Sequence, residues 1–238
     1  MKEEQRQNAI RRKVVGMNAG SVEMLTSGFP SFDEVTGGLP RGRIVELFGG
    51  SGTGKTTLAL QIAAHIQKSG GVAWIDAERS FDPAYAAGLG VIVDQLAVVQ
   101  PTTAEQAFDM MARLALSGAV DLLIVDSAAA LAPEIELQTG IGKSGPGAHS
   151  RALASGLRKL AAALRRSGTA ALFLNQTRAG DESSAGGAPL KLFAAARISL
   201  RRPGGGRVRF RVVKSKASEA FREGHLLWQN GGGFTECP

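Results

Sequence analysis

One glycine-rich segment constrains the fold and chemistry of this chain more than any other. Its residues are Gly49, Gly50, Ser51, Gly52, Thr53, Gly54, Lys55, Thr56 and Thr57. An apolar run, 44–48, precedes the segment, and a helical pattern follows it from Leu58. The glycines let the backbone turn tightly, so that its N–H groups and the start of the next helix face one anion. Lys55 supplies a cation and Thr56 a hydroxyl ligand for Mg²⁺. The segment is therefore a P-loop, and it predicts binding of a nucleoside triphosphate.

Apolar runs and helical patterns alternate along most of the remaining chain. The early apolar runs are continuous, as in strands buried on both faces of a parallel sheet with helices between them. We therefore expect an α/β fold with a mostly parallel central sheet flanked by helices. The expected strands lie near residues 43–48, 72–76, 96–99, 121–126, 169–175, 195–201, 207–214 and 226–230. The clearest expected helices are 29–35, 103–117 and 150–167.

Local signals refine this pattern at three places. Thr102 followed by Glu105 predicts a capping box at the start of helix 103–117. The arginine-rich, alternating segments on either side of residues 203–206 predict an antiparallel basic hairpin. The stretches 133–149 and 178–189 carry no regular pattern, and loops of this length in a compact domain are usually functional or disordered.

Composition places the chain among ordinary globular proteins. It has 238 residues, of which 44% are hydrophobic and 21% charged, so we expect one main domain, 37–238, after a short arm, 1–36. Its single cysteine, Cys237, allows no disulfide framework, and its histidines are scattered. Since no apolar run reaches about 18 residues and the polar start has no signal-peptide core, we expect a cytoplasmic protein with no membrane partner.

Positive charge is concentrated in the second part of the chain. Residues 1–142 have a net charge of −5 and residues 143–238 a net charge of +12, within a total of +7. A basic half indicates a polyanionic partner, most often nucleic acid, although a solvated basic surface is the alternative. In helix 150–167, Arg151, Arg158 and Arg165 recur every seven residues beside a leucine stripe, and the same two interpretations apply to this arginine row.

Two acids lie where a P-loop enzyme requires carboxylates. Asp126 ends the apolar strand 120–125, where an acid can hold Mg²⁺, although an Asp here can also cap the next helix. Glu78 follows the strand expected beside the P-loop strand, where a carboxylate can orient or deprotonate an attacking water.

The motifs together resemble the bacterial RecA recombinase family over residues 21–235. The segments that carry this resemblance are 42–47 (Gly-Arg-Ile-Val-Glu-Leu), 75–78 (Ile-Asp-Ala-Glu), 82–85 (Asp-Pro-Ala-Tyr), 117–121 (Ser-Gly-Ala-Val-Asp), 125–127 (Val-Asp-Ser), 175–178 (Asn-Gln-Thr-Arg) and 213–216 (Val-Lys-Ser-Lys). They occur in the family's order and at near-family spacing. The resemblance implies a RecA-type ATPase core that uses ATP and Mg²⁺, binds single- and double-stranded DNA, and assembles with itself into a helical filament.

The resemblance also implies roles at the nucleotide. Glu78 matches the catalytic glutamate and Asp126 the magnesium-site acid, with Thr56 as the second metal ligand. Asp82 and Tyr85 match the residues that hold the adenine. Gln176 matches the glutamine that senses the γ-phosphate and moves the second DNA loop.

Two further sets of residues are matched to partners outside the subunit. Lys214 and Lys216 match lysines that reach the neighbouring subunit's ATP, whereas the residues alone would favour exposed lysines at a strand end. Residues 134–149 and 178–189 match the two DNA-facing loops. The implied DNA-binding residues are Arg151, Arg158, Arg178, Gly186 and Gly187.

The chain departs from the family pattern in three places. The second loop is short, lacks the aliphatic and aromatic side chains that separate base triplets, and carries Asp181 and Glu182. The sequence ends soon after Phe234, so we expect the usual C-terminal domain to be missing, and the N-terminal arm is abbreviated. Trp228 lies near the position of an aromatic residue beside the adenine.

These features leave more than one function open. The intact nucleotide and interface residues favour a DNA-dependent ATPase that pairs homologous DNA in repair. The short second loop and missing domain favour a paralogue that acts as an ATP-binding regulatory or adaptor subunit in damage tolerance without strand exchange. A generic P-loop kinase would not explain the basic half.

Overall fold

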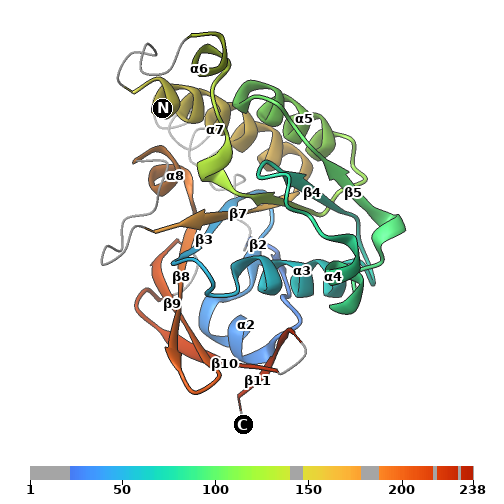
Figure 1. Ribbon diagram of the computed structural model, residues 1–238, viewed down its shortest axis with the longest axis vertical. Helices are drawn as coiled ribbons and strands as arrows, with labels where there is room; N and C mark the ends of the chain where they lie inside the picture. The colour runs from blue at the N-terminus through green and yellow to red at the C-terminus, as the bar shows by residue number, and fades with distance from the viewer. Residues whose placement is uncertain (1–21, 140–146, 178–187, 217–218, 230–231, 238) are drawn as a thin grey trace, which may run out of the picture.

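The computed structural model describes residues 22–139, 147–177, 188–216, 219–229 and 232–237, and its centre is a nine-stranded sheet (Figure 1). The strands of the sheet are β3 (Ile44–Gly49), β4 (Val72–Asp76), β5 (Leu96–Val99), β6 (Leu122–Asp126), β7 (Ala170–Gln176), β8 (Ala196–Gly204), β9 (Arg207–Ser215), β10 (Glu223–Trp228) and β11 (Phe234–Glu236). The helices are α2 (Pro30–Thr36), α3 (Lys55–Ile66), α4 (Pro83–Gly88), α5 (Ala104–Leu116), α6 (Glu134–Gln138), α7 (Ala148–Ser167) and α8 (Ala188–Phe193). β1 (Met24–Leu25) and β2 (Leu39–Pro40) form a separate small antiparallel pair.

The sheet is parallel over most of its width and antiparallel at one edge. Its strand order is β11-β10-β9-β8-β3-β7-β6-β4-β5. The strands from β8 to β5 pair in parallel, whereas β8, β9, β10 and β11 pair antiparallel. The predicted α/β fold and the basic hairpin, which is β8–β9, are therefore confirmed. The expectation that the strand before Glu78 lies beside the P-loop strand is wrong, because β7 and β6 lie between β4 and β3. The parallel pairing still brings the ends of β3, β4, β6 and β7 to one edge, where the site is built.

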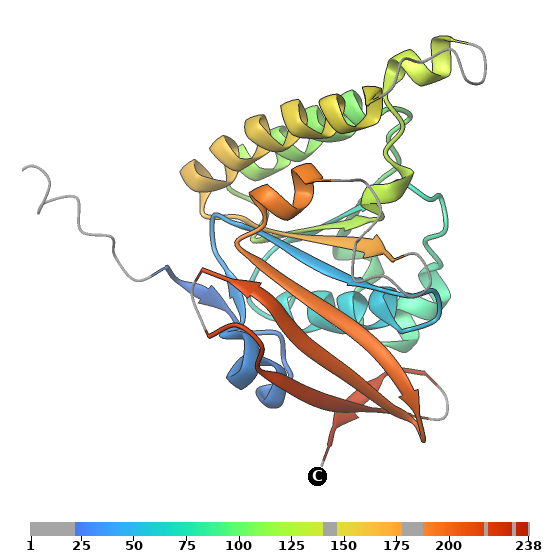
Figure 2. The ribbon, with the colours of Figure 1, turned by 90° about the vertical axis from the view of Figure 1, so that its left-hand side faces the viewer.

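The two faces of the sheet pack against different helices (Figure 2). On β3, Val45 and Leu47 point to the face that α2 and α3 cover, whereas Ile44 points to the face that α5 and α7 cover. This alternation of side chains explains why every residue of β3 is buried and why the strand is apolar apart from Glu46. Residues 30–36 of the expected arm form α2, and Phe32 stacks on Phe210 at 5.1 Å within the main core. The division at residue 36 stays a prediction.

The longest helix, α7, has the two faces that its sequence predicts. Its buried leucines are Leu153, Leu157, Leu160 and Leu164. Arg151, Arg158 and Arg165 form a separate, exposed row on the same helix. Among the described residues, we find no helix with the length and apolar character needed to cross a membrane.

The structure corrects three local predictions. The capping box lies one residue later than expected, because Thr103 Oγ1 accepts from Gln106 N at 3.0 Å while the carboxylate of Glu105 accepts from Glu134 N. The stretch 133–149, expected to be irregular, contains α6, and α7 already begins at Ala148. α6 was missed because five residues are too few to show a helical period. The short strand β11 was missed because its pairing depends on β10 rather than on its own pattern.

The contact between α5 and α7 generates a stability prediction. A Cβ at Gly156 on α7 would lie 2.0 Å from Cδ2 of the buried Phe108 on α5. Gly156→Val should therefore lower the free energy of unfolding by about 1–3 kcal/mol more than Ser155→Val, an exposed neighbour on the same helix. Urea denaturation of both variants measures the difference. Equal losses would mean that the helices do not meet at this glycine.

Candidate nucleotide-binding and catalytic site

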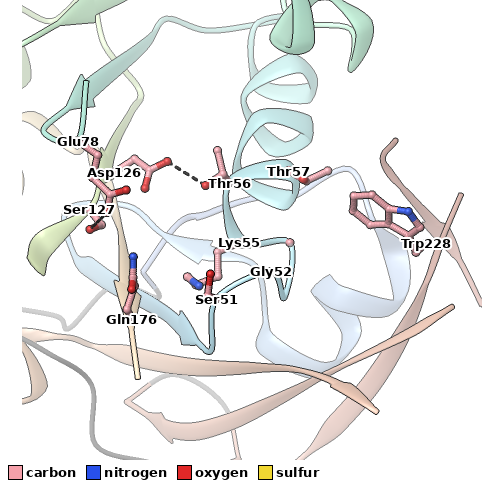
Figure 3. Close-up of a pocket in the computed structure, with 11 residues that line it drawn as sticks. Ser51, Gly52, Lys55, Thr56, Thr57, Glu78, Asp126, Ser127, Gln176 and Trp228 are labelled. Atoms are coloured by element: carbon pink, nitrogen blue, oxygen red, sulfur yellow. Dashed lines mark hydrogen bonds between the residues drawn. The ribbon is translucent and has the colours of Figure 1, made fainter. Parts of the chain in front are cut away.

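The P-loop joins the end of β3 to the start of α3. Gly54 lies immediately before α3 with φ +89°, a conformation that glycine adopts without strain. A pocket opens beside this loop (Figure 3). Its lining residues are Ser51, Gly52, Gly54, Lys55, Thr56, Thr57, Glu78, Asp126, Ser127, Gln176 and Trp228. The pocket thus collects residues from strands that are distant in sequence.

Lys55 lies folded against the loop that carries it. Its Nζ donates to the carbonyl oxygens of Gly50 at 2.8 Å and Gly49 at 3.1 Å. Burial lowers the pKa of the ammonium, and the carboxylates of Asp126 and Glu78 oppose that change. A phosphate in the pocket would offer stronger acceptors than these carbonyls, because hydrogen bonds between charged groups are the stronger kind.

Thr56 and Asp126 meet directly at the centre of the pocket. The Thr56 hydroxyl donates to Asp126 Oδ2 at 2.9 Å (Figure 3). Burial raises the pKa of Asp126 to about 6, and the nearby carboxylates of Glu78 and Asp76 add to the effect, whereas the Thr56 hydrogen bond opposes it. A carboxylate that is buried beside other acids is stabilised by a cation.

This donor set fits Mg²⁺ bound to a nucleotide. A hydroxyl and one carboxylate supply oxygen ligands and leave the remaining positions to water and phosphate, as Mg²⁺ prefers. Among the described residues, no group of three His, Cys, Asp or Glu side chains forms a dedicated metal cage. Thr56 and Asp126 therefore suit a metal that arrives with the triphosphate.

Glu78 is held by contacts that the sequence reasoning did not identify. The Ser127 hydroxyl, which follows Asp126, donates to Glu78 Oε1. Asp76, buried at the end of β4, accepts from Ser80 N at 3.0 Å, Phe81 N at 3.2 Å and Gln100 Nε2 at 2.9 Å. These bonds fix the turn that carries Glu78. The available signal was a second acid two residues before Glu78 at the end of a buried strand.

Gln176 lies at the end of β7, beside the P-loop. The register pairs it with Gly49 of β3, and its side chain lines the pocket. Its backbone N–H donates to Asn175 Oδ1 at 3.0 Å. The residue is thus placed between the nucleotide pocket and the chain segment that continues toward residue 178.

The two residues expected at the adenine, Asp82 and Tyr85, form hydrogen bonds within the subunit and do not line the pocket. Asp82 caps α4, where its Oδ1 accepts from Ala84 N at 2.8 Å and Tyr85 N at 3.0 Å. The Tyr85 hydroxyl hydrogen-bonds the Thr57 hydroxyl at 2.7 Å. Neither Asp82 nor Tyr85 lines the pocket, whereas Trp228 does, beyond Thr57 (Figure 3). The adenine role of Asp82 and Tyr85 stays a prediction.

The last described strand packs against the P-loop. A Cβ at Gly54 would lie 2.4 Å from the ring of Phe234, which stacks edge-on with Trp228 at 5.2 Å. Gln61 of α3 both donates to the Phe234 carbonyl and accepts from its N–H. The pocket wall that Trp228 provides is therefore fixed to the loop that would bind phosphate.

Lys214 and Lys216 lie away from this pocket. Ser215 of β9 pairs with Ala196 of β8, and Ala196 pairs with Val45 near the start of β3. The two lysines therefore lie at the opposite end of β3 from the P-loop. Lys214 Nζ donates to the Lys191 and Leu192 carbonyls of α8 at 2.6 and 3.3 Å. Burial lowers the pKa of Lys214, and the positive charges of Lys216 and Arg197 lower it further.

The candidate DNA-binding residues are only partly described. Arg151 and Arg158 are exposed on α7, whereas Arg178, Gly186 and Gly187 lie outside the described residues. A second basic surface lies on β9 and its neighbours. Val208, Phe210 and Val212 face the core, so the alternating Arg209 and Arg211 face the other side of the sheet.

Comparisons with known proteins agree with this arrangement. The chain matches the family model described as the RecA N-terminal domain over residues 6–234. It is 42% identical over 235 residues to Protein RecA of Deinococcus radiodurans, which covers 90% of this chain and 65% of that protein. It is 43% identical over 221 residues to Protein RecA of Kineococcus radiotolerans (85% of this chain, 64% of that protein) and 44% identical over 233 residues to that of Thermus thermophilus (90% and 68%). The chain thus spans about two thirds of the length of these relatives.

Two glycines of the P-loop provide a matched test of the packing beneath the pocket. Gly52 and Gly54 both have positive φ, but a Cβ at Gly52 would meet no atom within 4 Å, whereas one at Gly54 would overlap the Phe234 ring. Gly54→Ala should therefore cost about 1–3 kcal/mol more unfolding free energy than Gly52→Ala. Denaturation of both variants measures this. The additional change Phe234→Leu should recover part of the loss in Gly54→Ala only, and equal recovery in both would contradict the contact.

Proposed function

Because the chain belongs to the RecA family, we propose that it is an ATP- and DNA-dependent recombinase, which forms filaments on single-stranded DNA and promotes homologous pairing and strand exchange in repair. The observation that carries the proposal is the convergence of Lys55, Thr56, Asp126, Glu78 and Gln176 on one pocket. The alternative, an adaptor subunit without strand exchange, is less well supported because the three relatives described above are all named Protein RecA.

ATP hydrolysis follows from the chemistry of these residues. The P-loop N–H groups and Lys55 bind the β- and γ-phosphates, and Thr56 and Asp126 would hold Mg²⁺, whose positive charge would offset the negative charge of the phosphates. Glu78, oriented by Ser127, positions the attacking water and accepts its proton. Trp228 and Tyr85 offer aromatic surfaces for the adenine.

Gln176 connects nucleotide and DNA in this proposal. Its side chain lines the pocket, and the chain continues from it into residues 178–189, the proposed second DNA loop. An amide that hydrogen-bonds the γ-phosphate moves when the phosphate leaves, and its backbone carries that movement into the following residues.

Arginines supply the sequence-independent part of DNA binding. Arg151 and Arg158 are exposed on α7, and Arg209 and Arg211 are half-buried on the face of the hairpin that points away from the core. Neutralising phosphates with arginine releases counterions and gives an affinity that depends little on base sequence. An enzyme that searches for homology needs this property, because base pairing must supply the specificity.

Filament assembly accounts for the position of Lys214 and Lys216. Both lie at the end of the sheet opposite to their own P-loop, where they cannot contact their own nucleotide but can contact that of an adjacent subunit. A cation donated in trans stabilises the charge that develops during phosphoryl transfer. The ATP site would then be complete only between two subunits.

ATP turnover tests the proposed chemistry. Single-stranded DNA should raise turnover severalfold in the wild type. Lys55→Ala should abolish the activity, and Glu78→Gln should lower kcat about 10²-fold or more because the water loses its base. Glu34→Gln, an exposed acid on α2, is the control and should behave as the wild type. Wild-type turnover that DNA does not change would overturn the proposal, and an assay of strand pairing then separates recombinase from adaptor.

The trans role of the lysines has its own test. Lys216→Ala should lower DNA-stimulated turnover about tenfold or more, whereas binding of a fluorescent ATP analogue to the isolated subunit should stay within about twofold of the wild type. Lys68→Ala removes an exposed lysine after α3 and should change neither quantity. Parallel losses of turnover and nucleotide binding in Lys216→Ala would refute an interface role.

A further inference from the structure

A buried polar network crosses the middle of the sheet on the face that α8 covers. Its centre is Glu46 of β3, whose side chain is fully buried. Glu46 Oε2 accepts from Arg197 Nε on β8 at 2.5 Å, and Glu46 Oε1 accepts from Asn175 Nδ2 on β7 at 2.8 Å. Arg197 also lies over the Phe48 ring, 4.5 Å from its centroid. Each carboxylate oxygen of Glu46 therefore has a defined donor from a different neighbouring strand.

One end of the network reaches Gln176. Because Asn175 Nδ2 donates to Glu46, Asn175 Oδ1 must face the other way, where it accepts from Gln176 N at 3.0 Å. The carboxylate thus determines the orientation of the Asn175 amide, and the amide holds the backbone of Gln176. A side chain at position 46 that donated a hydrogen bond instead of accepting one would disturb the orientation of the Asn175 amide.

The other end lies beside Lys214. Arg197 is the register partner of Lys214 across β8 and β9. Lys214 in turn donates to the last carbonyls of α8, whose first two residues, from Ala188, were expected to end the second DNA loop. The negative charge of Glu46 opposes the effect of the neighbouring cations on the Lys214 pKa, so the carboxylate acts electrostatically on both Arg197 and Lys214.

We propose that Glu46 is a positioning residue that couples the γ-phosphate sensor Gln176 to the interface lysine Lys214 and to α8, so that nucleotide and DNA affinities depend on each other. The inference rests on the proposed function and adds residues to it. A buried carboxylate is costly to desolvate, and an apolar group of similar size often stabilises a protein equally well. The three strands β7, β3 and β8, joined through this one carboxylate, instead give Gln176 and the β9 neighbour of Arg197, Lys214, a common reference position.

Linkage between the two ligands tests the proposal. The affinity of a labelled thymidine oligonucleotide is measured by anisotropy with and without a non-hydrolysable ATP analogue and Mg²⁺, and the ratio is the coupling factor. Glu46→Gln should lower this factor about tenfold while each ligand's affinity in the absence of the other stays within about twofold of the wild type. Asp121→Asn is the matched control, because it removes an acid that pairs with Arg41 at 2.8 Å outside the network. Its coupling factor should not change.

Several outcomes would overturn the inference. A folded Glu46→Gln with the wild-type coupling factor shows that the network does not transmit. Equal losses of both separate affinities show a structural role only. If Glu46→Gln does not fold, Asn175→Ala, which retains the Glu46–Arg197 pair, must show the same loss of coupling. If the coupling factor of the wild type is one, the proposed function and this inference are both overturned. If the wild type shows coupling and Glu46→Gln shows the same coupling factor, the inference alone is overturned.

Discussion

The parallel pairing of β3 with β7 on one side and β8 on the other is the constraint on which the rest of the structure depends. The register places Gly49 beside Gln176 and Leu200, so the P-loop starts where the glutamine ends its strand. A Cβ at Gly49 would lie 2.4 Å from the Leu200 carbonyl oxygen, so only glycine permits this approach. The antiparallel pairing of β9 with β8 then places Lys214 and Lys216 at the far end of the sheet. The backbone pairing of these strands therefore places Gln176 at the pocket and the two lysines away from it.

Two ionisable groups of the pocket are buried, and their neighbours only partly offset the cost of burying their charges. Asp126 and Lys55 are both shifted toward their neutral forms by burial, although they oppose each other's shift. Such a site is stabilised when a metal and a phosphate bring the opposite charges. The protein thus keeps polar groups in positions that suit the ligand better than the free subunit.

The sequence predicted the fold and much of the site, because continuous apolar strands and a P-loop have direct local signatures. Asp126 and Glu78 were found because each follows a buried strand, and parallel strand ends meet at one edge. Ser127, Asp76 and Glu46 were not assigned roles. Their importance depends on partners 49, 24 and 151 residues away, respectively. A pattern confined to neighbours in sequence carries no information about such contacts. Local signals also failed at α6 and β11, which are too short to show a period.

By itself, the sequence determined that this chain has a P-loop between a strand and a helix, that its sheet is buried on both faces, and that its second half is basic. These properties depend on residue type and on spacing along the chain, which the sequence states directly. Only the tertiary structure decided that Glu46 joins Arg197 to Asn175, that Phe234 packs on Gly54, and that Lys214 donates to α8. Strand order and register create these contacts, because they set which distant side chains share one face of the sheet.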